Sequence, residues 1–374
     1  MRVAVLSHTY VERENRKKLY AIAGQSVAVT LYAPARWRES ALGREWRVGG
    51  ETDGGVHVVP LAVRRPIATP AAAWWDLRPL RKALRAGRHD LLHVEEEPWS
   101  LVARGAAQMA NGAGIPATLF TWNNLPHHPP WPLSALARRV APRYDGWVAG
   151  NRTAANLLRR LSGTKPLVVL PQLGIDPPRR RGPPPEPHDR LEIGYVGRLV
   201  PEKGVADLLD AVARMRGEAR LTLVGAGPAQ GDLERRAGAL GIAERVAFLG
   251  AVPHDEVQAI LRRLDVLVLP SRTTPRWAEQ FGHVLLEAMA AGAVVVGSDS
   301  GAIPEVIGEV GIVFPEGDAE ALAGALDTLA TDEQTRDRLR NAGCARAEAY
   351  AHSQIAKRLI AFWQRITAAL TLSA

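Results

Sequence analysis

Two acidic residues lie in a segment that is otherwise largely apolar. Glu279 and Glu287 bracket Phe281 and Gly282 in AEQFGHVLLEAMAAG, which runs between two apolar stretches that look like buried strands. A carboxylate buried without a partner is strongly destabilising. An ionised carboxylate accepts hydrogen bonds from two neighbouring hydroxyls, so a sugar or a ribose would be a suitable partner. For Glu287, which lies within the expected buried helix HVLLEAMAAG, the alternative is a salt bridge to an arginine of the core.

Two cations flank a turn between another expected strand and a helix. In YVGRLVPEKGVADLL (195–209) a buried strand ends at Gly197, and Arg198 and Lys203 lie on either side of the turn that follows. Fixed positive charge and the free N–H groups of a helix N-terminus both favour a pyrophosphate. The alternative is a basic loop in a basic protein.

A glycine-rich turn follows the next expected strand. LVGAGPAQG (223–231) holds Gly225, Gly227 and Gly231, a spacing one residue too long for the dinucleotide fingerprint. No acidic residue stands where such a fingerprint would bind the ribose. We therefore expect no nicotinamide cofactor, and interpret the segment as a tight turn whose Gly225 allows a ligand to approach closely.

Short apolar stretches alternate with helix-compatible stretches along both halves of the chain. The first half contains RVAVLS (2–7), SVAVTLYAP (26–34), VHVVPLAV (56–63), DLLHVE (90–95), ATLFTW (117–122), GWVAGN (146–151) and LVVLPQLG (167–174). The second half contains LEIGYVG (191–197), LTLVG (221–225), VAFLG (246–250), VLVLPS (266–271), VVVGSD (294–299) and IVFP (312–315). Such continuous Val, Leu and Ile stretches are typical of parallel strands covered on both faces. We predict the α/β class, with two doubly wound, Rossmann-like parallel-sheet domains.

A proline-rich segment separates the two patterns. DPPRRRGPPPEPHDR (176–190) excludes helix and strand, and we interpret it as an exposed linker. The predicted domains are therefore 1–175 and 191–350, and we expect residues 351–374 to form a helix that packs back on the first domain. Two similar domains of this kind would face a ligand across a shared cleft.

The bulk composition limits the class of protein. With 374 residues, a net charge of +8 and a pI near 10.0, the chain is a basic globular protein of two-domain size. The single Cys344 excludes an intrachain disulfide and any cysteine-based zinc site. No apolar stretch is long enough to span a membrane, and no signal peptide is evident, so we expect a cytoplasmic protein. The charge is compatible with nucleic acid, an anionic membrane or a phosphate-bearing ligand.

The order of the motifs resembles a known family. The second half contains, in this order, GRLVPEKG, LVGAGP, VAFLGAVPHDE, VLVLPS, EQFGHVLLE, EAMAAG and SDSGAIPEV. Together they resemble the retaining nucleotide-sugar glycosyltransferases of family four. The first half resembles that family more loosely, through VEEEPWSLVA, VAGN and LPQLGID. The resemblance implies the GT-B fold, with two domains facing across a cleft, and a retaining, hexosyltransferase-like activity.

The resemblance implies catalytic roles for three residues. Arg198 and Lys203 would bind the donor diphosphate and neutralise the charge that develops on the leaving group. Glu279 would hold hydroxyls of the transferred sugar, helped by the backbone amides around Phe281 and Gly282. Because the leaving phosphate would serve as the base, the two glutamates would not form the acid and base pair of a glycoside hydrolase.

Further donor contacts are implied in the same way. Glu287 would bind the ribose hydroxyls, and the nucleobase would lie near Val252, held by backbone contacts. Gly197 and Gly225 would line the same donor site. The co-substrate would be a nucleotide-diphosphate sugar, with no further cofactor. No acidic metal-binding motif is evident at a strand end, so we expect no metal requirement.

The acceptor side departs from the family pattern. Many relatives have a glycine-rich loop after the first strand and a histidine after the strand found here as LFTW, whereas this chain has SHTYVERENRKKL and Trp122 with Asn123. We take His8, Glu97, Trp122 and Asn123 as acceptor-side candidates, because each follows a predicted strand. Glu95, Glu96 and Trp99 belong to the same segment. The three glutamates could equally form a solvated turn, and the tryptophans could belong to the core.

Two basic segments could contact a membrane. RENRKK (13–18) and RRPIATPAAAWW (64–75) combine cations, the second with tryptophan, which would suit an anionic surface that carries a lipid-linked acceptor. The alternative is a solvated face. The acceptor itself, whether glycan, lipid-linked or small molecule, is not indicated by the sequence.

Two other functions fit parts of the sequence. A GT-B sugar-nucleotide epimerase would use a similar donor site but would need no acceptor. A basic nucleic-acid-binding protein would fit the pI, yet we recognise no nucleic-acid reading module and expect no nucleic-acid partner.

Overall fold

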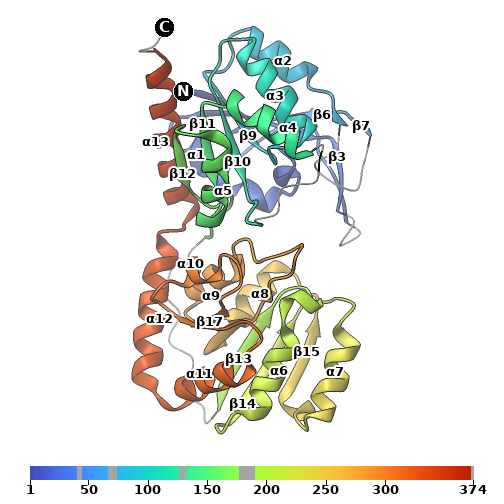
Figure 1. The fold of residues 1–374 in the computed structure, drawn as a ribbon, viewed down its shortest axis with the longest axis vertical. Coiled ribbons are helices and arrows are strands. Elements are labelled where there is room, and N and C mark those ends of the chain that lie inside the picture. Colours follow the sequence, from blue (N-terminus) through green and yellow to red (C-terminus); the bar gives the residue numbers. More distant parts are fainter. Residues whose placement is uncertain (40–43, 66–73, 126–130, 132, 177–189, 372–374) are drawn as a thin grey trace. The chain divides into compact units, whose positions relative to one another are not determined.

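The chain forms two compact units (Figure 1). The computed structural model describes residues 1–39, 44–65, 74–125, 131, 133–176 and 190–371. Met1–Gly174 and His352–Ala374 make up the first unit, and Ile175–Ala351 the second. Most of the predicted linker, residues 177–189, lies outside the described residues.

The first unit contains an eight-stranded sheet in the order β12-β11-β10-β9-β1-β2-β6-β5. All neighbouring strands are parallel except β5, which is antiparallel to β6. Each strand predicted for this half is present. The strands are β1 (Arg2–Ser7), β2 (Ala28–Pro34), β5 (Glu51–Asp53), β6 (Val56–Leu61), β9 (Leu91–Glu95), β10 (Ala117–Thr121), β11 (Gly146–Ala149) and β12 (Leu167–Val169).

Helices cover both faces of this sheet because alternate residues of each strand point to opposite faces. In β1, Ala4 and Leu6 pack in one core and Val3 and Val5 in the other. The first core also contains residues of α2 (Arg78–Arg85), α3 (Leu101–Asn111), α4 (Leu133–Val140) and α5 (Arg152–Ser162). The second contains residues of α1 (Lys17–Ala23) and α13 (His352–Thr371), so the C-terminal helix completes the first unit.

Short antiparallel pairs were not predicted. β3 (Arg36–Glu39) pairs with β4 (Arg44–Arg47), and β7 (Val63–Arg65) pairs with β8 (Trp74–Trp75). The apolar stretch 56–63 is therefore divided: β6 ends at Leu61, and Val63 begins a strand of another sheet.

The second unit contains a six-stranded parallel sheet in the order β15-β14-β13-β16-β17-β18. All six predicted strands are present, which confirms two Rossmann-like parallel-sheet units. The strands are β13 (Leu191–Val196), β14 (Ala219–Val224), β15 (Val246–Gly250), β16 (Val266–Leu269), β17 (Val294–Ser298) and β18 (Ile312–Phe314). The helices are α6 (Val205–Arg214), α7 (Gln230–Ala239), α8 (His254–Leu261), α9 (His283–Ala291), α10 (Ile303–Ile307), α11 (Ala319–Thr331) and α12 (Glu333–Glu348).

Helix α11 begins with a side-chain N-cap. Asp318 caps α11 through its side chain, which accepts from the N–H groups of Glu320 and Ala321.

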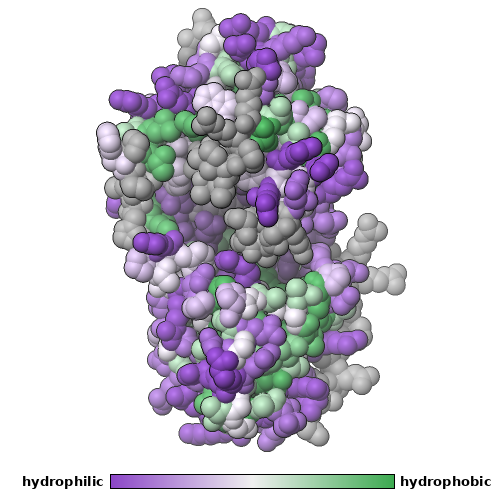
Figure 2. Space-filling view, turned by 90° about the vertical axis from the view of Figure 1, so that its right-hand side faces the viewer, coloured by the Kyte–Doolittle hydropathy of each residue, from purple (hydrophilic) through white to green (hydrophobic). Residues whose placement is uncertain are grey.

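None of the helices in the described part of the chain is long and apolar enough to cross a membrane. On the face drawn in Figure 2, hydrophilic and apolar residues are interspersed.

The C-terminal helix should be essential to the stability of the first unit. Trp363 in α13 is fully buried in the second core, so Trp363→Ala should destabilise the first unit by about 3–5 kcal/mol. Hydrogen exchange should accelerate in β1, β9 and β10 and stay unchanged in β13 and β16. Gln364→Ala, at an exposed position of the same helix, is the control. Equal acceleration in both units would contradict this packing role.

Candidate functional site

The strand order of the second unit reverses beside its central strand β13. From β13 the chain proceeds outward through β14 and β15, and from the neighbouring β16 it proceeds the other way through β17 and β18. In open parallel sheets, ligands bind at the carboxyl ends of the strands where the order reverses in this way. The segment after β13 carries Lys203, and the segment after β16 carries Glu279.

Lys203 and Glu279 meet at this reversal point. The Lys203 ammonium lies 2.5 Å from Oε2 of Glu279, and the two side chains are 14% and 10% exposed. The hydroxyl of Ser271, directly after β16, donates to the same oxygen at 2.9 Å. The ammonium also lies 4.8 Å from the centre of the Trp277 ring. Lys203 is thus a cationic partner of Glu279.

Arg198 follows β13 on the same edge of the sheet and is exposed. The Tyr195 hydroxyl donates to the backbone carbonyl of Arg198 at 2.7 Å and fixes the start of this loop. Burial raises the pKa of Tyr195, the negative charge of Glu279 raises it further, and Arg198 opposes both. Arg198 and Glu279 therefore both act on Tyr195, which keeps its proton at neutral pH.

The glycine turns pack the loops of this edge against each other. Gly225 has a φ of +132°, and a Cβ there would lie 1.8 Å from the carbonyl oxygen of Gly197. A Cβ at Gly227 would lie 2.2 Å from the carbonyl oxygen of Leu199. Side chains are thus excluded at both positions by backbone contact. Val252, the expected nucleobase contact, comes shortly after β15 on the same edge and is half-buried.

Helix α9 positions the remaining donor-side residues. It begins after Gly282, as predicted, and Phe281 before it is buried with its ring 5.9 Å from that of Tyr350. Glu287 is half-buried rather than enclosed, with 20% of its side chain exposed. Its Oε1 lies 3.7 Å from Nδ1 of His283, one turn earlier. The carboxylate thus keeps access to solvent and to a ligand.

The first unit has an equivalent reversal between β1 and β9. His8 follows β1, and its Nδ1 lies 2.6 Å from Oε1 of Glu96, which follows β9. The backbone N–H of His8 donates to the same oxygen at 3.0 Å, and the ring stacks on Trp37 at 4.6 Å. Burial opposes the charged form of His8, but the Glu96 carboxylate outweighs it and raises the pKa of His8. The Glu96 carboxylate therefore favours the protonated form of His8.

Glu97 titrates near neutrality. Burial raises its pKa to about 7, against the hydrogen bonds that it accepts from Thr121 and Trp122. The Thr121 hydroxyl donates to Oε2, and the backbone N–H of Trp122 donates to Oε1 at 3.2 Å. The N–H of Asn123 donates to the same hydroxyl at 3.1 Å. Three of the acceptor-side candidates are thus joined around Thr121.

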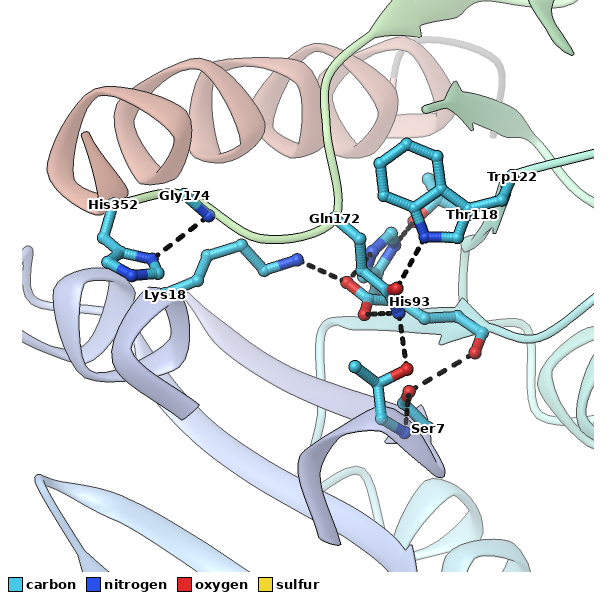
Figure 3. A network of polar contacts seen from close by, with 10 residues as sticks. Ser7, Lys18, His93, Thr118, Trp122, Gln172, Gly174 and His352 are labelled. Carbon is cyan, nitrogen blue, oxygen red and sulfur yellow. Dashed lines mark hydrogen bonds and ion pairs between the residues drawn. The ribbon is translucent and has the colours of Figure 1, made fainter. Parts of the chain in front are cut away.

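A buried network lies behind these candidates (Figure 3). Lys18 and His93 contact Oε1 of Glu95, at 2.6 and 3.1 Å. Burial opposes the charge on Glu95, but Lys18 and His93 hold the pKa of Glu95 well below its usual range. Gln172 donates to Oε2 of Glu95 at 2.9 Å and accepts from the indole N–H of Trp122 at 2.8 Å. The network therefore occupies the Glu95 carboxylate and the polar atom of Trp122.

The segment RENRKK is not a uniformly exposed basic face. Arg16 and Lys18 are both 1% exposed, and Arg16 contacts the carboxylates of Glu51 and Asp53 at 2.8 and 2.9 Å. A signal for this existed in the sequence: Lys18 lies one helical turn before the buried Ile22 of α1 and so shares its buried face. Sequence reasoning also missed Ser271 and Trp277 beside Lys203, and Trp37 beside His8.

Solved structures with a similar architecture include glycosyltransferases. Sucrose-phosphate synthase from Thermosynechococcus elongatus superposes with a TM-score of 0.72 at 19% identity, over 99% of this chain and 100% of that one. An Anabaena protein solved in complex with UDP and glucose superposes with a TM-score of 0.70 at 20% identity, over 98% and 100%. The fold is therefore GT-B, the two-domain architecture of a large class of glycosyltransferases.

Sequence relatives define the family within this class. Residues 20–179 match the model for Glycosyltransferase Family 4, and residues 178–346 that for Glycosyl transferases group 1. The 2-deoxystreptamine N-acetyl-D-glucosaminyltransferase of Streptomyces fradiae is 33% identical, over 71% of this chain and 67% of that protein. The phosphatidyl-myo-inositol mannosyltransferase of Mycobacterium leprae is 31% identical, over 77% and 76%. The chain belongs to this glycosyltransferase family, and its activity is glycosyl transfer.

The raised pKa of Glu97 predicts a pH-dependent effect of Glu97→Gln on stability. The folded-state pKa of about 7 exceeds the ordinary value of 4.5, so the folded protein loses stability as the pH rises from about 4.5 to 7. Glu97→Gln removes this penalty and should stabilise the protein by about 2–3 kcal/mol more at pH 8 than at pH 4. Urea unfolding at both pH values measures it. A difference between variant and wild type that is independent of pH would contradict the assigned pKa.

Proposed function

We propose that this enzyme transfers a sugar from a nucleoside diphosphate donor to an acceptor hydroxyl with retention of the anomeric configuration. The observation that carries the proposal is the meeting of Lys203 and Glu279 at the strand-order reversal of the second unit. A cation for phosphate and a carboxylate for hydroxyls stand side by side there, as a phosphate-linked sugar requires.

The donor contacts follow from this arrangement. Lys203 and Arg198 bind the diphosphate, and Glu279 binds hydroxyls of the transferred sugar. The backbone of Phe281 and Gly282 lies beside that sugar, and Glu287, with part of its carboxylate exposed, binds the ribose. Gly197, Gly225 and Val252 lie on the same carboxyl edge, where the nucleotide would contact the backbone. The Anabaena protein of the same fold holds UDP.

The reaction requires no protein nucleophile. The bond between the anomeric carbon and the diphosphate oxygen breaks, and the acceptor oxygen bonds to that carbon on the same face. The acceptor proton moves to the departing phosphate. Arg198 and Lys203 then supply the main catalytic effect, because they stabilise the negative charge that builds up on the leaving group. Since these two cations compensate that charge, the proposal includes no metal ion or other cofactor.

Family membership selects glycosyl transfer over the two alternatives, epimerisation and nucleic-acid binding. The names of the relatives include a small acceptor, 2-deoxystreptamine, and a lipid-linked one, phosphatidyl-myo-inositol. The acceptor of this enzyme is accordingly a hydroxyl compound bound near His8, Glu97, Trp122 and Asn123. Trp122 offers its ring rather than its N–H group, which Gln172 occupies.

The donor class is testable by ligand-induced stabilisation. Uridine, guanosine, adenosine and thymidine diphosphates should be screened by thermal shift, and one of them should raise the Tm of the wild type. Lys203→Met should abolish that shift and lower transfer roughly 100-fold once a donor is found, while the protein stays folded. Arg216→Met, an exposed arginine of the same unit, is the control. A wild-type shift that survives in Lys203→Met would disprove the diphosphate role.

We infer a peripheral membrane contact from a surface of the first unit. A hollow of about 440 Å³ lies over α2 and α3, where Trp74 is 56% and Leu101 38% exposed. Arg78, Arg81 and Arg104 line the same hollow. Exposed apolar side chains among arginines suit the boundary of an anionic lipid layer. Of the two segments proposed from the sequence, only the described end of 64–75 contributes to this surface, since residues 66–73 lie outside the described part.

Vesicle flotation tests this contact. The protein should float with phosphatidylcholine vesicles that contain phosphatidylglycerol and not with pure phosphatidylcholine, and salt should weaken the binding. The double change Arg81→Glu and Arg104→Glu should abolish flotation. Arg262→Glu with Arg263→Glu alters the net charge equally on the second unit and should leave flotation unchanged. Equal loss in both double variants would show that net charge alone, not this surface, binds the vesicles.

A further inference from the structure

The two loops that carry Lys203 and Glu279 approach each other at the level of the backbone. Lys203 ends a short 3-10 turn, Pro201–Lys203, which Gly204 links to α6. Gly204 has a φ of +64°, and a Cβ there would lie 1.9 Å from the carbonyl oxygen of Pro270. The loop after β13 therefore lies directly against the start of the loop after β16.

Arg272 ties these loops together through two separate contacts. Its backbone N–H donates to the carbonyl oxygen of Glu202 at 2.8 Å. Its guanidinium forms a bidentate pair with Asp207 in the first turn of α6, with Nε at 2.7 Å and Nη2 at 2.5 Å from the two carboxylate oxygens. Arg272 directly follows Ser271, which donates to Glu279. The pair thus links the helix after Lys203 to the strand end that orients Glu279.

The two partners differ in burial. The Asp207 side chain is 7% exposed, whereas that of Arg272 is 50% exposed. A carboxylate with so little access to water depends on its guanidinium partner, and a planar guanidinium fits both oxygens where an ammonium does not. The geometry of the pair is therefore more demanding than that of an ordinary surface salt bridge.

Little else supports the turn from this side. Pro201, Gly204, Asp207 and Arg272 line a pocket of about 780 Å³. Packed apolar side chains therefore do not cover the turn here. A second pair, Arg236 with Asp210, lines the same pocket with an Nη2 to Oδ2 distance of 2.6 Å, but it joins α6 to α7 and touches neither loop. It is a natural control.

We propose that Asp207 and Arg272 are a positioning pair that holds Lys203 against Glu279 in the geometry needed for a diphosphate-linked sugar. Neither residue touches the donor. The pair acts through two segments: α6 fixes the backbone directly after Lys203, and the segment 271–272 after β16 fixes Ser271, which donates to Glu279. This role rests on the proposed donor function, because the geometry matters for a diphosphate only if Lys203 binds one.

The test uses Arg272→Gln, Arg272→Lys and Asp207→Asn in the full chain. Arg272→Gln should weaken binding of the stabilising nucleoside diphosphate about tenfold in calorimetry, since small displacements of a positioned charge are costly. The corresponding nucleoside, which lacks phosphate, should bind unchanged. Arg272→Lys should recover only part of the loss because it restores the charge and not the fork. Arg236→Gln should stay within about twofold of the wild type.

A second measurement does not depend on any nucleotide. Lys203 should react slowly with an acetylating reagent in the wild type, because Glu279 and Trp277 hold its ammonium. Arg272→Gln should accelerate this labelling several-fold, as quantified by peptide mass spectrometry, and Arg236→Gln should not. If Arg272→Gln proves too unstable, the double variant Asp207→Asn with Arg272→Gln removes the unpaired carboxylate and should still show fast labelling.

The outcomes separate the two ideas. Unchanged Lys203 labelling in both Arg272→Gln and the double variant would overturn the positioning role. Fast labelling with no binding of any of the four nucleoside diphosphates by the wild type would support the tie between the loops but contradict the proposed donor. Equal loss of diphosphate and nucleoside affinity in Arg272→Gln would show general damage to the unit and would also overturn the proposal.

Discussion

The central constraint on this molecule is the reversal of strand order in each parallel sheet. Where neighbouring parallel strands send the chain in opposite directions, their carboxyl ends are left without a covering connection. In the second unit the reversal brings together Lys203 and Glu279, and in the first it brings together His8 and Glu96. Residues far apart in the sequence thereby become partners, and their chemistry follows from the two strands that each unit places side by side.

The ion pairs of the two units differ in how deeply they are buried. Lys18 and Glu95 are 1% and 2% exposed, and the additional bonds from His93 and Gln172 satisfy the carboxylate internally. Such a pair fixes the scaffold and has no surface left for a ligand. Lys203 and Glu279 keep part of their surface exposed, so a ligand can exchange with either partner. Two lysine–glutamate pairs thus differ in their access to solvent, and only the more exposed pair is proposed to bind a ligand.

The sheets were well predicted from the sequence because parallel strands are buried on both faces and therefore have continuous apolar sequences. All thirteen stretches became strands. The antiparallel pairs β3–β4 and β7–β8 were missed, because strands such as RWRE and REWR at a surface lack the apolar pattern.

Partnerships between distant residues were harder to predict. Lys203 and Glu279 were assigned to separate parts of a donor. They contact each other because β13 lies beside β16 in the sheet, which the sequence does not show. Lys18 was interpreted as surface charge, since its partner Glu95 lies 77 positions away along the chain. Neither Asp207 nor Arg272 was singled out by the sequence analysis. The spacing of residues in the sequence indicates which residue types could bind a ligand, whereas the order of the strands in the sheet determines which of them contact each other.

The raised pKa of Glu97 raises the question of whether this carboxyl acts as a general base. A carboxyl that titrates near neutrality is often a general base. Here the perturbation has a local cause, burial beside the Glu96 carboxylate. In the proposed mechanism the acceptor proton moves to the departing phosphate. Near pH 7 the carboxyl of Glu97 exists in both protonation states, so it can accept from one hydroxyl or donate to another. Its physical state therefore suits recognition of a hydroxyl compound, whereas the proposed mechanism assigns the catalytic effect to Arg198 and Lys203.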